Sequence, residues 1–263
     1  MLVLLGPSFD GTNASFQRLA EATGLVAYDL RSRIKPGWWG VIRALGDAEQ
    51  AELMAARLRK EGFPVVAVDV NSAWDPERRP VKVQGARLES AELVLVVRER
   101  EMAIPYAAIL ALVRGELGSG SQVTHGRPRR VSSSTFRAVV PSSADLQVRD
   151  LGTESYQALD IHFHTAMWFG RVDPRGFDFT GMPNVTGHPL RDLEGFVEEL
   201  AHRSGVRIDK GAKMSSLAPY SLHGQRRITP VPGRSQEPPP DPFDGYTRLV
   251  AEAESAAFQH RAD

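Results

Sequence analysis

The first 70 residues of the chain alternate short apolar runs with amphipathic segments, and this order restricts the fold more than any other feature. Apolar runs of this length predict buried strands, whereas apolar side chains spaced three and four apart predict helices. The strands expected on this basis lie at residues 2–5, 26–34, 38–45 and 63–70. The expected helices occupy residues 13–24 and 47–62, the second capped by Asp47.

The order of these elements is strand-helix-strand-strand-helix-strand, which is that of the ferredoxin-like fold. The two middle strands are joined by the tight turn Lys35-Pro36-Gly37, in which proline presets φ and glycine is free to take a positive φ. We therefore expect a four-stranded sheet with both helices on one side.

Residues 81–211 predict a second, strand-rich lobe closed by a helix at 193–205. Residues 107–117 fit a strand or a helix equally well, and residues 118–143, rich in Gly, Ser, Arg and Pro, predict a mobile insertion. Several short strands followed by one helix resemble, in outline, the small bacterial pleckstrin-homology-like barrels. The resemblance implies a PH-like lobe.

The C-terminal part of the chain changes composition again. Residues 212–242 are rich in Pro, Ser and Arg, as expected of a disordered linker, and helical spacing returns at 243–263. This short amphipathic helix either packs on its own body or docks on a protein partner, and we expect the second. Its candidate partner-binding residues are Phe243, Tyr246, Leu249, Val250 and Phe258.

The chain is thus predicted to be an α+β protein of two lobes and an arm. Its segments are a ferredoxin-like lobe at 1–70, a linker at 71–80, a strand-rich lobe at 81–211, a Pro-rich linker at 212–242 and a tail helix at 243–263.

Charge and cysteine content limit the classes of partner. The 32 basic residues are balanced by 32 acidic residues, so no net field attracts nucleic acid or an anionic membrane, and neither is expected as a partner. No apolar run is long enough to span a membrane. The absence of cysteine excludes thiolate metal sites and disulfides and is compatible with the cytoplasm, where we expect the protein. Arginine greatly outnumbers lysine, which suggests a bacterial source.

The string Asp160-Ile161-His162-Phe163-His164-Thr165 is the clearest chemical motif. It resembles the metal-binding string that opens the polymerase-and-histidinol-phosphatase metallohydrolases. The resemblance implies a metal site of Asp160, His162 and His164. Apart from the resemblance, His188 is a further candidate ligand. Alternate residues of a strand point to one face, so the two imidazoles could converge. The alternative is an amphipathic strand with Ile161 and Phe163 inward and the histidines facing solvent.

The loop at residues 6–13 follows a strand and precedes a helix. Its two glycines have the spacing of a phosphate-binding P-loop, but Thr12 and Asn13 stand where lysine and serine or threonine belong, so a nucleotide triphosphatase is not expected. Free backbone N–H groups at a helix N-terminus can still hold a small anion. The candidate ligand-binding residues are Gly6, Gly11, Thr12 and Asn13.

No complete catalytic motif is found in the sequence, and no cofactor is expected. Three hypotheses follow. The first is a non-catalytic binding or scaffold protein that uses the C-terminal arm. The second is a metal-dependent hydrolase built on Asp160, His162 and His164, and the third is a sensor of a small ligand or anion in the N-terminal lobe.

Overall fold

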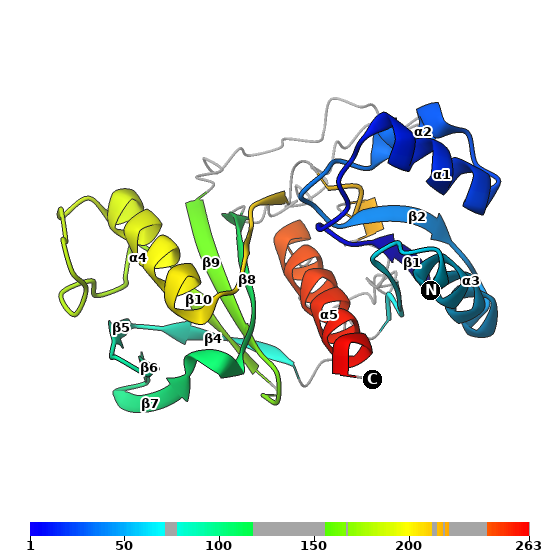
Figure 1. The fold of residues 1–263 in the computed structure, drawn as a ribbon. Coiled ribbons are helices and arrows are strands. Elements are labelled where there is room, and N and C mark those ends of the chain that lie inside the picture. The colour runs from blue at the N-terminus through cyan, green and yellow to red at the C-terminus, as the bar shows by residue number, and fades with distance from the viewer. Residues whose placement is uncertain are drawn as a thin grey trace, which may run out of the picture.

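The computed structural model describes residues 1–71, 78–117, 156–166, 168–211, 215–217, 219–220 and 241–262. The insertion predicted at 118–143 and most of the predicted linker at 212–242 lie outside these ranges. Within them the protein is a mixed α+β structure with three sheets (Figure 1). None of the helices in the described part is both long and apolar enough to cross a membrane.

The N-terminal lobe is a three-stranded antiparallel sheet with helices on one face. The central strand β1 pairs with β2 on one side and β3 on the other. Successive side chains of β1 point to opposite faces, so Val3 and Leu5 pack under the helices while Leu2 and Leu4 face the rest of the molecule. The elements are β1 (Leu2–Leu5), α1 (Asn13–Thr23), α2 (Ala27–Arg33), β2 (Gly40–Ala44), α3 (Ala48–Lys60) and β3 (Val65–Val68).

The strand predicted at residues 26–34 is wrong, because this segment forms the helix α2. Its large apolar residues lie at even positions, which fits a strand, but Leu30 and Ile34 are also four residues apart, as on one turn of a helix. Only these two are buried, whereas Val26 and Tyr28 are exposed. The sheet therefore has three strands instead of four, and the ferredoxin-like arrangement is not confirmed.

The free edge of β2 is covered by side chains from a distant segment. The Val41 N–H donates to the Ser216 hydroxyl at 2.7 Å, and the Ser215 hydroxyl donates to the Trp39 carbonyl at 2.6 Å. These bonds satisfy backbone groups that a fourth strand would otherwise pair.

The second lobe contains a five-stranded mixed sheet in the order β11-β8-β9-β10-β4 and a three-stranded meander, β5-β6-β7. The β10–β4 and β11–β8 pairs are parallel and the others antiparallel, so the predicted PH-like barrel is not confirmed. Residues 107–117, ambiguous in sequence, form mainly a strand. The elements are β4 (Arg79–Val83), β5 (Gly85–Leu88), β6 (Glu92–Val97), β7 (Arg100–Pro105), η2 (Tyr106–Ala108), β8 (Ile109–Leu117), β9 (Tyr156–Phe163), β10 (Trp168–Val172), α4 (Pro189–Ser204) and β11 (Ile208–Asp209).

The helix predicted near the C-terminus, α5 (Pro242–Ala262), lies between the two lobes (Figure 1). One side of α5 contacts β1, β2 and β3, and another contacts β8 and β9, so a single apolar core joins all three layers. Of the predicted partner-binding residues, Phe243, Tyr246, Leu249 and Val250 are buried in this core, and Phe258 alone is exposed. The helix thus packs on its own body, whereas the sequence favours docking on a partner.

Candidate functional site

The N-terminal half of α5 covers charged side chains on β9 and β10. Asp160 and His162 are two residues apart on β9, so both point toward α5, and both are completely buried. Arg171 on β10 lies on the same face. These residues, with Arg78, Asp244, Thr247 and Glu252, form what we call the ion cluster.

Asp160 forms a two-pronged ion pair with Arg171. Both carboxylate oxygens accept hydrogen bonds of 2.7 Å, from Nε and one terminal nitrogen of the guanidinium, and the other terminal nitrogen lies 2.7 Å from Asp244. Burial raises the pKa of Asp160, and the Arg171 guanidinium opposes this shift. The pair links β9, β10 and α5, and it leaves Asp160 with its lone pairs already engaged.

His162 is a neutral imidazole with a defined tautomer. Burial lowers its pKa well below the ordinary value, and the neighbouring Arg78 and Arg171 lower it further. Arg78 can only donate, so Nδ1 of His162, 3.4 Å from its guanidinium, is the acceptor. The ring proton is therefore on Nε2, which donates to the Thr247 hydroxyl at 2.7 Å.

The predicted metal ligands are not brought together. His164 follows the end of β9 and packs on the Phe258 ring of α5, with 4.4 Å between the ring centroids. His188 precedes α4, the helix that packs on the opposite face of the sheet. Across the described ranges no three His, Asp or Glu side chains are placed to hold a metal ion. His162 also faces α5 and not solvent. The alternative, an amphipathic strand whose histidines face solvent, is therefore wrong for this residue.

The predicted anion-binding loop already contains its own carboxylate at the start of α1. Asp10 accepts hydrogen bonds from the Thr12 N–H at 3.0 Å and the Ser15 hydroxyl at 2.9 Å, and these bonds lower the pKa of Asp10. The Thr12 hydroxyl caps α1 by accepting from the Ser15 N–H. Gly11 has φ of +67°, and any side chain there would overlap Pro36. A glycine is thus needed at position 11 because no larger residue fits there.

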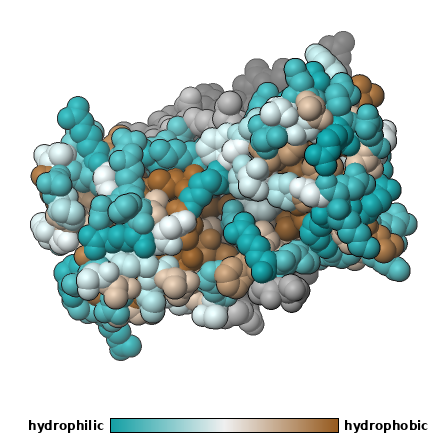
Figure 2. Space-filling view, viewed as in Figure 1, coloured by the Kyte–Doolittle hydropathy of each residue, from teal (hydrophilic) through white to brown (hydrophobic). Residues whose placement is uncertain are grey.

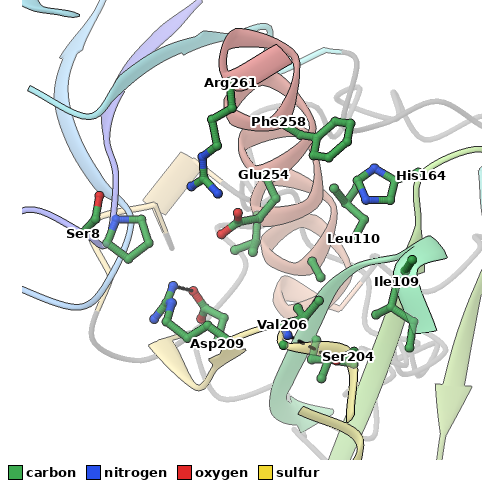
Figure 3. A pocket seen from close by; sticks show the side chains of 17 residues that line it. Ser8, Ile109, Leu110, His164, Ser204, Val206, Asp209, Glu254, Phe258 and Arg261 are labelled. Carbon is green, nitrogen blue, oxygen red and sulfur yellow. Dashed lines mark hydrogen bonds and ion pairs between the residues drawn. The ribbon is translucent and has the colours of Figure 1, made fainter. Parts of the chain in front are cut away.

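A cavity of about 450 Å³ lies where the two lobes meet the C-terminal half of α5, and we call it the interlobe cavity. Figure 2 shows hydrophobic side chains gathered in a recess between the half of the molecule that carries α4 and the half that carries α1, α2 and α3. Its apolar lining includes Ile109, Leu110, Val250 and Phe258. Its polar lining comprises Ser8, His164, Ser204, Arg207, Asp209, Glu254 and Arg261 (Figure 3).

Asp209, one of the residues that line the cavity, has a carboxylate oxygen with unused hydrogen-bonding capacity. Its Oδ1 accepts from the Tyr246 hydroxyl at 2.7 Å and the Gly211 N–H at 2.8 Å. Its Oδ2 is buried and accepts no hydrogen bond from the described residues, although Arg207 lies 3.6 Å away. Burial raises the pKa of Asp209, against the effect of its two hydrogen bonds. A buried oxygen of this kind is costly unless something donates to it.

Glu254 adds a second carboxylate from α5. Its Oε1 accepts from the Trp39 Nε1–H at 3.0 Å, and burial raises its pKa while that hydrogen bond opposes the shift. Figure 3 shows Glu254 and Arg261 leaving α5 on the side that faces Ser8. Carboxyl groups with raised pKa values in a cavity are a common property of ligand sites.

Sequence reasoning missed Asp209 and Glu254. One signal was available for Glu254, because Val250, Glu254 and Phe258 are spaced by four, which puts a carboxylate within an apolar stripe of a helix. Asp209 lies on a strand of two residues, which is too short to show a periodic pattern. Of the predicted ligand-binding residues, Gly6 borders a cavity of about 370 Å³, next to Pro7 and Ser8.

Comparisons of the chain with protein families, with curated proteins and with solved structures gave no significant match. The site is therefore interpreted from its own geometry.

Proposed function

We propose that the protein is a non-catalytic binding protein that takes a small organic molecule into the interlobe cavity. The observation that carries this proposal is Asp209, which lines the cavity and whose buried Oδ2 atom lies 3.6 Å from Arg207 but accepts no hydrogen bond from the described residues. A ligand with an N–H or O–H donor would satisfy it. The cavity volume of about 450 Å³ falls within the usual range for small-molecule sites.

The position of the cavity supports the same proposal. Its walls come from the β1–α1 loop, β8, the segment from α4 to β11, and α5, so a ligand there would contact both lobes at once. Sites between lobes are common because a ligand can be largely enclosed there while a few polar groups fix its orientation.

The other two hypotheses receive less support from the packing. A protein partner that bound the apolar face of α5 would have to displace the helix from the core that joins the two sheets. A metal ion at Asp160 and His162 would compete with Arg171 for the carboxylate and would lie near the guanidinium of Arg78.

The test is a thermal-shift screen of the whole protein against nucleosides, nucleotides, amino acids, dipeptides and amines. We expect at least one compound to raise the melting temperature, because a ligand at 100 times its dissociation constant adds about 2.7 kcal/mol to the stability of the folded state. Asp209→Asn should abolish that shift, since it replaces the accepting Oδ2 with a donor.

Tyr246→Phe is the matched control. It removes the hydroxyl that donates to Oδ1 of Asp209 but leaves Oδ2 in place. The shift should persist in this variant. A panel in which no compound stabilises the parent protein would refute the proposal, and so would a shift that is unchanged in Asp209→Asn.

A further inference from the structure

A second cavity of about 370 Å³ adjoins the first, and we call it the adjacent cavity. Pro7, Ser8, Glu254 and Arg261 line both cavities. The first two belong to the β1–α1 loop, and the last two lie seven residues apart on α5 and so share a face of the helix. The two spaces therefore meet between this loop and the C-terminal half of α5 (Figure 3).

The walls of the adjacent cavity are mostly apolar. Trp39 and Phe63 contribute aromatic rings, and Val65, Val66 and Ala257 contribute aliphatic groups. The Trp39 ring is held in place because its N–H donates to Glu254. Such walls suit the apolar body of a ligand, with polar contacts confined to the ends.

The charged side chains of the adjacent cavity are mainly basic. Arg59, His260 and Arg261 line it, against the single carboxylate of Glu254. Arg59 also donates to the Val65 carbonyl at 3.1 Å and lies 3.8 Å from Glu52, so it is fixed in position but partly neutralised. The Trp39 hydrogen bond engages one oxygen of Glu254. A cavity lined in this way favours an anionic group.

The two ends of the joined space thus require opposite groups. At one end Asp209 has a buried oxygen that needs a donor, and at the other end the basic residues favour an acid. We infer that the ligand is an organic anion with an N–H donor at its opposite end, with the donor at Asp209 and the acid among Arg59, His260 and Arg261. This inference rests on the proposed function. Nucleoside monophosphates and dipeptides with a free amino terminus both have this chemistry.

Calorimetric titration of the full chain with two matched pairs of probes tests the inference and separates the two sources. The pairs are guanosine monophosphate with guanosine, and phenylalanylglycine with its C-terminal amide. In each pair the second compound keeps the N–H donor but lacks the acid. We expect the acid-bearing member of one pair to bind at least tenfold more tightly than its acid-free partner. The pair that behaves in this way identifies the source as nucleotide or peptide.

Arg261→Ala should weaken the acid-bearing probe by about tenfold, the equivalent of about 1.4 kcal/mol, and leave the acid-free probe unchanged. Lys60→Ala is the matched control, because it removes a positive charge from α3 next to Arg59 but does not line either cavity. It should change neither affinity.

The inference is overturned if neither acid-bearing probe binds, if the acid-free compounds bind equally well, or if Arg261→Ala has no effect. Asp209→Asn separates this failure from failure of the proposed function. If binding of an acid-free probe is lost in Asp209→Asn, the interlobe cavity is still the binding site although the inference on the acid group is wrong. If no bound probe depends on Asp209, the proposed site itself is wrong.

Discussion

The two halves of α5 contact the rest of the protein in opposite ways. The N-terminal half covers the ion cluster, in which Asp160, Arg171 and His162 have their hydrogen bonds within the protein. The C-terminal half borders two cavities, where Asp209 keeps an oxygen that accepts no hydrogen bond from the described residues. Buried ion pairs such as Asp160–Arg171 link neighbouring elements, whereas polar groups that line a cavity are available to a ligand. The difference assigns stability to one half of the helix and binding to the other.

The largest effect is expected from Arg171→Met. It leaves the completely buried Asp160 without its ion-pair partner, and losing one partner of a buried pair costs about 3–5 kcal/mol of unfolding free energy. Chemical denaturation measures the loss. The double variant Asp160→Leu/Arg171→Met should recover much of it, because the uncompensated charge is then gone. A loss below about 1 kcal/mol for the single variant would show that this half of α5 is not held by the ion cluster.

A smaller loss is expected from Thr247→Val, which keeps the shape of the side chain but removes the acceptor for Nε2–H of His162. An unsatisfied buried donor costs about 1–3 kcal/mol, and the same denaturation experiment measures it. Thr165→Val is the control, because Thr165 is exposed, and it should change the stability by less than about 0.5 kcal/mol. Equal stability of the two variants would contradict the assigned role of His162.

The smallest effect is a pH dependence at the cavity half. The pKa of Asp209 is raised on folding, so between its ordinary value of 3.8 and its folded value the folded state holds the extra proton. Stability from this group is therefore greatest below pH 3.8 and falls as pH rises through that window. The stability of Asp209→Asn relative to the parent should rise with pH over the same window, as measured by melting temperatures at a series of pH values.

Asp178→Asn provides a control of opposite sign. Hydrogen bonds from Thr180 lower the pKa of the exposed Asp178, so its stabilising contribution is present above pH 3.8 and is lost as pH falls. The stability of this variant relative to the parent should therefore fall as pH rises. If both variants show the same trend, the carboxyl group of Asp209 is not destabilised by its burial.

Local patterns in the sequence predict most of the helices and strands, but they do not predict which distant segments pack over them. The helix α3 was predicted from its apolar stripe and from Asp47, which does cap it, and α4 from the spacing of Leu193, Phe196 and Val197. These signals lie within a few neighbouring residues. The prediction for residues 26–34 is wrong because the same apolar positions fit both the period of a strand and that of a helix. Burial of Leu30 and Ile34 under the rest of the lobe decides between the two periods.

Local sequence patterns could not predict the contacts of the candidate site either, because these contacts also join distant segments. Asp160 and His162 share one face of β9, but the partners that engage them, Arg171 and Thr247, come from other elements. Asp209 meets Tyr246 only because β11 and α5 are packed together. Contacts between segments so far apart in the chain leave no trace in a short window of sequence.

The central position of α5 also affects how the protein is made. Its contacts span long stretches of chain, as in the hydrogen bond between Trp39 and Glu254, which are 215 residues apart. During synthesis both sheets emerge before the helix that covers their inner faces, so a growing chain exposes the apolar side chains of β1 and β8 until α5 arrives. Closure of this core is thus a late step of folding, and chains interrupted before α5 should be prone to aggregate or to be held by chaperones.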